Sequence, residues 1–220
     1  MALLLCIDTS SPVCSVALAN GTRLVSLHET TEHNAHARLL TTLIQACVAD
    51  AGIALNEIDA IAVNTGPGSF TGLRIGVSTA KGIAYALKKP VIAISSLQAL
   101  AYGISSQNNA PFYLPLVDAR HGKVYAALYD AEMMAISSPT LLHVDMLEKN
   151  NFLNRAGTLA GGTGSNSAQH ILNEKNIEVI PSLLATAQQL IEPAERLWHS
   201  STFADLAFFE PEYVQEFGNK

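Results

Sequence analysis

The chain has 220 residues, with 13 basic and 19 acidic side chains and a formal net charge of −6 at pH 7. Hydrophobic residues make up 49% and charged residues 15%, which excludes a disordered chain and predicts a sizeable buried core. This length allows one large domain or two small lobes. The acidic balance, without a cluster of Lys and Arg, makes the chain a poor nucleic-acid binder on its own.

The apolar segments do not predict insertion into a membrane. The longest are broken well before the roughly 20 residues that a span needs. Residues 1–8 have no basic segment before their apolar run, which ends in an acid, so we expect a buried strand rather than a signal peptide. The cysteines, Cys6, Cys14 and Cys47, lie in apolar surroundings and imply no disulfide framework. We therefore expect small core residues in a reducing cytoplasm.

The N-terminal half predicts an antiparallel meander of strands followed by alternating helices and strands. Asn20-Gly21 supplies a tight hairpin turn, because both central positions of that turn favour positive φ. Gly52 is expected to cap the end of the first long helix, and Ser69 the start of the second. The expected strands are 3–8, 14–18, 23–28, 59–63 and 91–94, and the expected helices are 34–51, 70–87 and 97–104.

The helix at 70–87 carries an apolar seam with the three- and four-residue steps of a helix–helix contact. A glycine inside a helix costs about 1 kcal/mol relative to Ala, so its internal glycines require a packing reason. Packing on its own sheet accounts for one face, and two apolar faces indicate that a partner covers the other. The seam consists of Phe70, Leu73, Val77, Ala80, Ala84 and Leu87, with glycines at 72, 76 and 82.

The C-terminal half repeats the opening of the chain in a looser and shorter form. An apolar strand over 112–117 ends at Asp118, as the first strand ends at Asp8, and each is followed by a turn and a second strand. This indicates an internal duplication, with an N-terminal lobe over 1–105 and a C-terminal lobe over 106–220. The further expected elements are strands at 124–129, 158–160 and 177–180 and helices at 167–174 and 183–198.

Asp8 and Asp118 are the first candidates for a functional site. If two lobes pack around a cleft, two carboxylates at strand ends can hold a metal–nucleotide complex or position a water. An aspartate that caps a strand-to-turn junction is an equally common structural feature, so both interpretations stay open. A ribonuclease-H-type nuclease would need several more carboxylates around two metals, and no other acid repeats at matching strand ends.

Glycine-rich segments and histidines are the next candidates. The turn at 66–69 meets a helix N-terminus, which favours an anion, but it lacks the Lys of a P-loop, so a plain turn is the simpler interpretation. The loop that starts at Gly161 and Gly162 lies between a strand and a helix and could contact an adenosine. His33 and His36 lack the further ligands of a zinc site, so we expect exposed histidines and no metal.

The segment 66–76, Gly-Pro-Gly-Ser-Phe-Thr-Gly-Leu-Arg-Ile-Gly, resembles the signature of the TsaB (YeaZ) family. The resemblance covers essentially the whole chain and implies an α/β fold: a two-lobed duplication of the actin, sugar kinase and Hsp70 class (ribonuclease-H-like), with mixed sheets flanked by helices. Further segments match the family in the same order: Asp8-Thr9-Ser10, 15–18, His36, 39–40, 118–120, 124–125 and the terminal 211–214.

The resemblance also implies a division of labour. TsaB proteins are partner subunits in making threonylcarbamoyladenosine on tRNA. Their catalytic relative TsaD moves the threonylcarbamoyl group from its adenylate to N6 of the adenosine beside the anticodon in tRNAs that read ANN codons. TsaD has a metal-binding H-x-E-G-H motif, and Ser96 and Leu100 stand here in place of its histidines. The chain is therefore expected to be a non-catalytic paralogue, or pseudoenzyme, that pairs with TsaD and activates it.

The resemblance further implies pairing through the first two helices. Alone, the chain should form a homodimer, because a bare apolar surface is unfavourable in water. A TsaE-type ATPase docks on the heterodimer, partner subunits use ATP and a metal ion, and tRNA is contacted only indirectly. Replacing Leu73 by Arg and Val77 by Glu is expected to abolish pairing and to leave the fold intact. The expected interface residues are Leu40, Leu43, Phe70, Leu73 and Val77, with Arg74 at the rim.

A vestigial nucleotide site is expected at Asp8, Thr9, Asp118, Gly161 and Gly162. The loop that contains the two glycines resembles the adenosine loop of active relatives more than is usual for the family. We expect it to bind a nucleotide weakly or not at all. The alternative is a stand-alone phosphotransferase or metallopeptidase of the same fold; the first would need a catalytic base and two phosphate loops, and the second the absent histidine pair.

Overall fold

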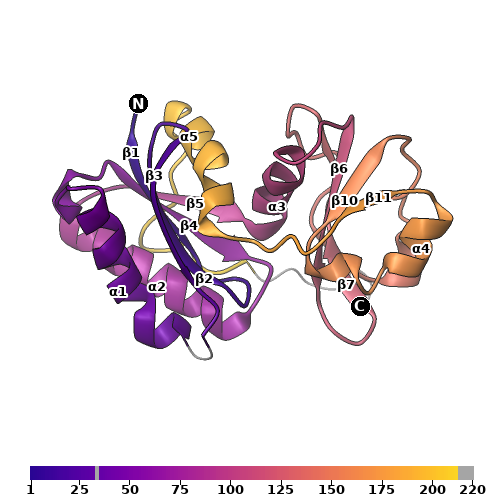
Figure 1. Cartoon of the computed structure of the whole chain (residues 1–220), viewed down its shortest axis with the longest axis horizontal. Coiled ribbons are helices and arrows are strands. Elements are labelled where there is room, and N and C mark those ends of the chain that lie inside the picture. The colour runs from indigo at the N-terminus through magenta and orange to yellow at the C-terminus, as the bar shows by residue number, and fades with distance from the viewer. Residues whose placement is uncertain (33–34, 213–220) are drawn as a thin grey trace. The chain divides into compact units, whose positions relative to one another are not determined.

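The computed structural model describes residues 1–32 and 35–212, which divide into two compact units (Figure 1). The first unit contains Met1–Ala99 and Ala185–Glu212, and the second contains Leu100–Leu184. The expected lobes, 1–105 and 106–220, are corrected in one respect. The chain returns to the first unit after residue 184, because an apolar segment near its end, including Leu190 and Ile191, packs on the first sheet.

The first unit is built on a five-stranded sheet in the order β3-β2-β1-β4-β5. Its strands are β1 (Leu3–Asp8), β2 (Cys14–Asn20), β3 (Arg23–Thr30), β4 (Ala60–Gly66) and β5 (Val91–Ser95). The central β1 pairs antiparallel with β2 and parallel with β4, and β3 and β5 extend the sheet on the two sides. The expected meander is confirmed, although the turn between β2 and β3, expected at Asn20-Gly21, is centred at 21–22, because Asn20 pairs with Arg23.

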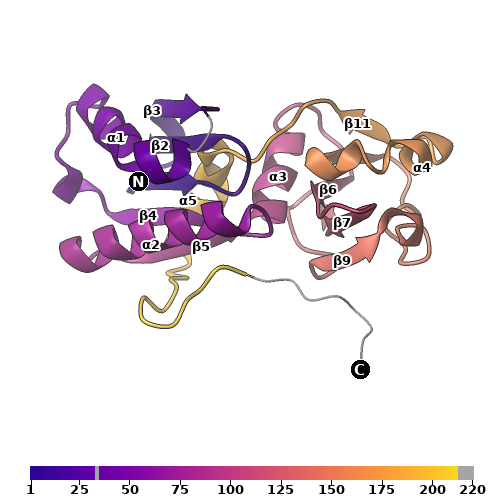
Figure 2. The ribbon, with the colours of Figure 1, turned by 90° about the horizontal axis from the view of Figure 1, so that it is seen from below.

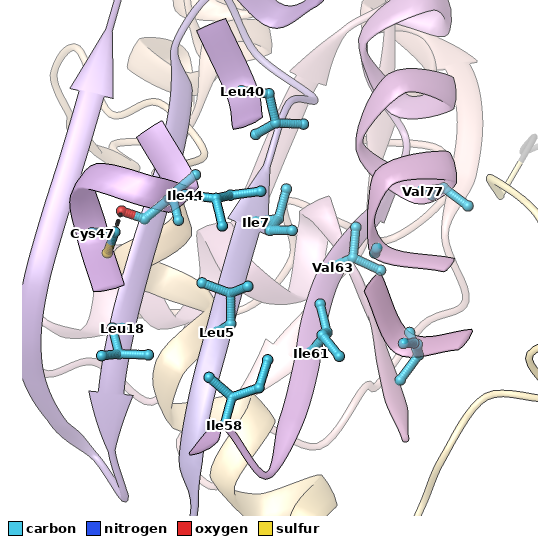
Figure 3. Close-up of a cluster of buried hydrophobic side chains, with 14 of the residues drawn as sticks. Leu5, Ile7, Leu18, Leu40, Ile44, Cys47, Ile58, Ile61, Val63 and Val77 are labelled. Carbon is cyan, nitrogen blue, oxygen red and sulfur yellow. Dashed lines mark hydrogen bonds between the residues drawn. The ribbon is translucent and has the colours of Figure 1, made fainter. Parts of the chain in front are cut away.

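Helices cover both faces of this sheet. Helices α1 (Ala35–Asp50) and α2 (Phe70–Leu87) pack on one face and α5 (Ile191–His199) on the other, whereas α3 (Ser96–Ser105) begins after β5 and continues into the second unit at Leu100. Because side chains alternate along a strand, Leu5 and Ile7 pack against α1 and α2, whereas Leu4 and Cys6 join the cluster that contains α5. Figure 3 shows the first of these clusters, in which side chains of α1 meet those of β1 and β4.

The apolar seam of α2 faces its own sheet. The buried residues of the helix are Gly72, Leu73, Gly76, Val77, Ala80 and Ala84. Ser69 caps the helix as expected, because its hydroxyl accepts a hydrogen bond from the Gly72 backbone N–H. Packing within the first unit therefore explains most of the seam.

The second unit repeats the plan of the first. Its strands are β6 (Phe112–Asp118), β7 (Lys123–Ala126), β8 (Tyr129–Asp130), β9 (Thr140–His143), β10 (Thr158–Gly161) and β11 (Glu178–Ile180), and α4 (Gln169–Glu174) lies wholly within it (Figure 2). The order is β11-β10-β6-β7-β9, with β8 also paired to β6. The central β6 pairs antiparallel with β7 and parallel with β10, as β1 does with β2 and β4. The expected internal duplication is confirmed in the strand topology.

The structure differs from the expected elements in three places. The strand at 124–129 ends at Ala126, and Tyr129 pairs instead with Tyr113 of β6. Strand β9 was not expected. The helix at 183–198 begins only at Ile191, after a short 3₁₀ turn, because hydrogen bonds to Ser11 and Ser15 hold the backbone of 185–187 against the first unit. The short 3₁₀ turns are Leu55–Glu57, Val144–Met146, Thr163–Ser165 and Ala187–Leu190.

Within residues 1–32 and 35–212, no helix has both the length and the apolar character needed to cross a membrane.

Candidate functional site

Asp8 lies fully buried at the end of β1 and is held by groups of its own unit. Its carboxylate accepts hydrogen bonds from the Ser10 backbone N–H (2.8 Å), the Ser10 hydroxyl (2.7 Å) and Asn64 Nδ2 (2.6 Å). Burial raises the pKa of Asp8, and these hydrogen bonds act in the opposite direction. The carboxylate is thus part of a closed internal network.

Asn64 and Ser96 complete this network, and neither role was expected from the sequence. Asn64 lies near the end of β4, and its Oδ1 accepts hydrogen bonds from the Ser96 hydroxyl (2.7 Å) and the Gly66 backbone N–H (2.9 Å). Ser96 follows β5. The carboxyl ends of parallel strands meet at one edge of a sheet, so polar residues at the ends of β1, β4 and β5 were the signal that could have grouped them.

Thr9 is also fully buried and connects the loop after β1 to α2. Its hydroxyl donates a hydrogen bond to the Gly72 carbonyl at 2.8 Å. The structure therefore brings Asp8 and Thr9 together in the first unit, where the partners of both polar groups are protein atoms.

Asp118 stands at the corresponding strand end of the second unit, and it is exposed. Its backbone N–H donates to the Thr163 hydroxyl (3.0 Å), and its carboxylate accepts a hydrogen bond from the Ser167 hydroxyl (3.2 Å). The two candidate aspartates thus share a topological position and differ in environment.

Gly161 and Gly162 are explained by close packing inside the second unit. A Cβ atom on Gly161 would lie 2.9 Å from Cγ1 of Ile104. Gly162 has a φ of +102°, and a Cβ there would collide with the carbonyl oxygen of Leu116 on β6. Both glycines are therefore required for packing, whether or not a ligand binds this loop.

The described residues contain no group of three His, Cys, Asp or Glu side chains arranged to hold a metal ion. His36 is half-buried at the start of α1, and its Nε2 donates to the Ser11 carbonyl at 3.0 Å. His33 lies outside the described residues, as do Tyr213 and Val214 of the expected terminal element.

Three of the expected interface residues belong to the core of their own unit. Leu40 and Leu73 are each 2% exposed and Val77 is 3% exposed. This corrects their assignment to a partner surface. It also corrects the expected effect of placing charges at Leu73 and Val77, because unpaired charges there would disrupt the core rather than only an interface. Leu43 is half-buried.

Phe70 and Arg74 lie on the solvent-exposed face of α2. Phe70 is 54% exposed, and the Arg74 guanidinium carbon lies 3.9 Å from the centre of its ring. The same face continues at four-residue steps through Ser78 and Gly82, with Tyr85 80% exposed near the end of the helix. The four-residue spacing of these residues was the sequence pattern that could have indicated an exposed face. It was missed because small and polar side chains do not form an apolar stripe.

A shallow groove of about 480 Å³ runs along this face. One lining residue comes from α1 and six come from α2, so the groove lies where the two helices expose adjoining surfaces. The lining residues are Ala37, Phe70, Thr71, Arg74, Ile75, Ser78 and Thr79. The groove combines an aromatic ring, a cation and small polar side chains, which suits a protein partner.

Comparison with known sequences finds similarity to proteins of tRNA threonylcarbamoyladenosine synthesis. The family model described as TsaD, tRNA N6-adenosine threonylcarbamoyltransferase, matches residues 30–161. The TsaB protein of Escherichia coli, named for tRNA threonylcarbamoyladenosine biosynthesis, is 37% identical over 153 residues. That match spans 65% of each chain, so it covers less than two thirds of the relative.

Solved structures extend the similarity to nearly the full length. A Pseudomonas aeruginosa protein described as similar to the peptidase YEAZ is 30% identical, with a TM-score of 0.87, and the match covers 98% of this chain and 100% of that one. The activator of 2-hydroxyisocaproyl-CoA dehydratase from Clostridium difficile is 10% identical, with a TM-score of 0.55 and coverage of 90% and 95%, and shows the shared fold alone. The fold is therefore the expected α/β duplication of the actin and sugar kinase class, and the chain belongs to the TsaB (YeaZ) family.

Proposed function

We propose that this chain is a non-catalytic partner subunit in the synthesis of threonylcarbamoyladenosine on tRNA. It pairs with a TsaD-type catalytic subunit and activates the transfer of the threonylcarbamoyl group to N6 of the adenosine beside the anticodon in tRNAs that read ANN codons. Membership of the TsaB family and the name of the Escherichia coli relative support the pathway. The match to the TsaD family model supports a relationship to the catalytic subunit itself.

The exposed groove on α1 and α2 is the observation that carries the pairing. Aromatic residues and Arg are enriched at protein interfaces, and Phe70, Arg74 and Tyr85 lie on one face of one helix. The small exposed residues Ser78 and Gly82 allow a partner helix to approach closely. Phe70 and Arg74 therefore remain our interface residues, with Ser78 in place of Leu73 and Val77.

The chain is proposed to use no nucleotide or metal cofactor of its own. Protein groups already satisfy the carboxylate of Asp8, and the hydroxyl of Thr9 is engaged with Gly72. ATP and a metal ion would then serve the partner subunits. A calorimetric titration with ATP should show no micromolar binding to the isolated chain; such binding would support the alternative of a phosphotransferase.

The remaining partners follow from the same proposal. The heterodimer is expected to accept a TsaE-type ATPase and to approach tRNA mainly through the catalytic subunit, because this chain has a net charge of −6. Without its partner, the chain is expected to pair with a second copy through the same groove. The cytoplasm is the proposed location, where its three free, buried cysteines would stay reduced.

Light scattering on this chain mixed with the TsaD-type protein of the same organism tests the pairing directly. A one-to-one complex is expected to replace the homodimer. Phe70→Ala should weaken the complex by about 2 kcal/mol, roughly thirtyfold, as truncation of an aromatic anchor does. Ser78→Arg should prevent its formation, because a long charged side chain would fill the groove.

Gln169→Arg on α4 is the matched control for Ser78→Arg, since it adds the same side chain to an exposed helical position in the other unit. It should leave the complex unchanged. Two proteins that do not associate at all would contradict the proposal. Stoichiometric zinc or iron in the purified chain would support a metallopeptidase instead.

A further inference from the structure

The loop after β1, residues 9–13, makes hydrogen bonds to both helices that carry the groove. The Ser10 carbonyl accepts the backbone N–H of Ser69, the N-cap of α2, at 2.8 Å. The Thr9 hydroxyl donates to the Gly72 carbonyl in the first turn of α2, also at 2.8 Å. The Ser11 carbonyl accepts from Nε2 of His36 in α1 at 3.0 Å. One short loop thus holds the starts of both helices.

Glycines of the signature segment make this contact sterically possible. A Cβ atom on Gly68 would lie 2.5 Å from the carbonyl oxygen of Ser10. On Gly72 and Gly76, one helical turn apart, a Cβ would collide with the carbonyl and the hydroxyl oxygen of Thr9. No side chain fits between this loop and α2 at these positions. The two segments are therefore in direct backbone contact, which fixes the register of the helix against the loop.

The loop is itself held from the side opposite the helices. Asp8 ties it to Asn64 on β4, and Asn64 is tied in turn to Ser96 after β5. The Ser11 hydroxyl donates to the carbonyl of Ala185 at 2.9 Å, where the chain returns to the first unit. Apart from the exposed Ser69 and the half-buried His36, the residues that anchor the loop are buried, so the loop is held as a support for both helices.

The helix starts that this loop holds also carry residues that line the groove. Phe70 and Arg74 flank Gly72 in the first turns of α2, and Ala37 directly follows His36 in α1. We propose that Thr9 is a positioning residue for the partner-binding groove: through its hydrogen bond to Gly72 and its contact with Gly76, it holds the start of α2 so that Phe70 and Arg74 are presented to the partner. This inference rests on the proposed function, because it takes the groove to be the site of pairing.

Thr9→Val tests this with little change in shape, since it replaces only the hydroxyl by a methyl group. Thr65→Val is the matched control, because Thr65 is also buried and donates to the Ile94 carbonyl (3.2 Å) on β5 instead of to a helix. The two variants should lose similar thermal stability. Thr9→Val alone should weaken binding of the TsaD-type subunit, by about 2- to 10-fold, and speed amide hydrogen exchange in residues 70–76.

A double-mutant cycle with Phe70→Ala separates positioning from a general loss of stability. If Thr9 acts through the first turn of α2, the effects of Thr9→Val and Phe70→Ala on affinity are coupled and fall short of their sum. Additive effects, or equal affinities for Thr9→Val and Thr65→Val, would overturn the inference and leave the proposed function standing. A wild-type chain that binds no TsaD-type subunit would instead overturn the proposed function, and the inference with it.

Discussion

The two units of the molecule share one sheet plan and differ in what covers the ends of their strands. In each, a central strand pairs antiparallel with a strand on one side and parallel with a strand on the other, and one further strand extends the sheet beyond each of these. In the first unit the aspartate that ends this strand is buried in a hydrogen-bonded network, whereas in the second the matching Asp118 is exposed. Equivalent strand ends of the duplicated sheet therefore place one aspartate in the interior and the other at the surface.

The helices differ even more than the strand ends. The first unit has α1 with 16 residues and α2 with 18 on one face of its sheet, whereas α4, which lies wholly within the second unit, has only 6. A six-residue helix presents less than two turns and offers little surface. This contrast shows how one duplicated fold can concentrate a binding surface in one copy, and the following predictions test that contrast.

Loss of a core side chain should lower the free energy of unfolding most, and the loss should be confined mainly to one unit. Leu5 on β1 and Leu114 on β6 are both fully buried in central strands. Truncating either to Ala should cost about 3 kcal/mol through lost burial and a residual cavity. Hydrogen exchange under mild denaturant should show the loss mainly in the unit that carries the substitution. Equal loss throughout both units would mean that they unfold as one.

Glycine substitutions should give intermediate effects of opposite sign. Gly72→Ala would force α2 away from Thr9 and cost about 2 kcal/mol. Gly82 has no heavy atom within 4 Å of an added Cβ, so Gly82→Ala should instead raise stability by up to about 1 kcal/mol. In the second unit, Gly162→Ala should resemble Gly72→Ala. Chemical denaturation measures all three, and a harmless Gly72→Ala would contradict the close contact between loop and helix.

The two aspartates should give the smallest effects and differ in pH dependence. Because burial raises the pKa of Asp8 above its ordinary value of 3.8, the folded chain keeps this proton to a higher pH than the unfolded chain. Its contribution to stability should be greatest below about pH 3.8, fall as the pH rises towards the raised pKa, and then stay level. Unfolding free energies of wild type and Asp8→Asn across this range should show the difference.

Asp118→Asn is the matched control in the second unit, and its exposed side chain should change stability by less than about 0.5 kcal/mol. An unfolding free energy of the wild type that rises with pH relative to that of Asp8→Asn would contradict the assigned direction of the pKa shift. Equal effects of the two substitutions would remove the contrast between the strand ends.

Much of the fold could be predicted from local pattern. The opening meander, the N-cap at Ser69 and the repeat of the strand-to-aspartate pattern depend on neighbouring residues, and the structure confirms them. The helix at 183–198 was predicted too long, because its periodicity does not record that Ser11 and Ser15, about 170 positions earlier, hold the backbone near residue 185. Long-range hydrogen bonds of this kind leave no local signal.

The candidate site was predicted less completely for the same reason. An apolar stripe at helical spacing is the same whether it faces its own sheet or a partner protein. Leu73 and Val77 were therefore predicted at the partner surface, although both are buried in the first unit. The exposed face, with Phe70, Arg74 and Ser78, was partly hidden because small and polar side chains carry no hydrophobic signal. Burial, which decides between the two faces, depends on the whole unit.

The sequence by itself determined the family and the repeat of the strand-to-aspartate opening, because these follow from short motifs and from periodicity. Only the tertiary structure decided that Asp8 is internal, that glycines at 68, 72 and 76 seat the loop after β1 against α2, and which face of α2 is open. The physical reason is that each of these depends on atoms far apart in the chain, which only packing brings within contact distance.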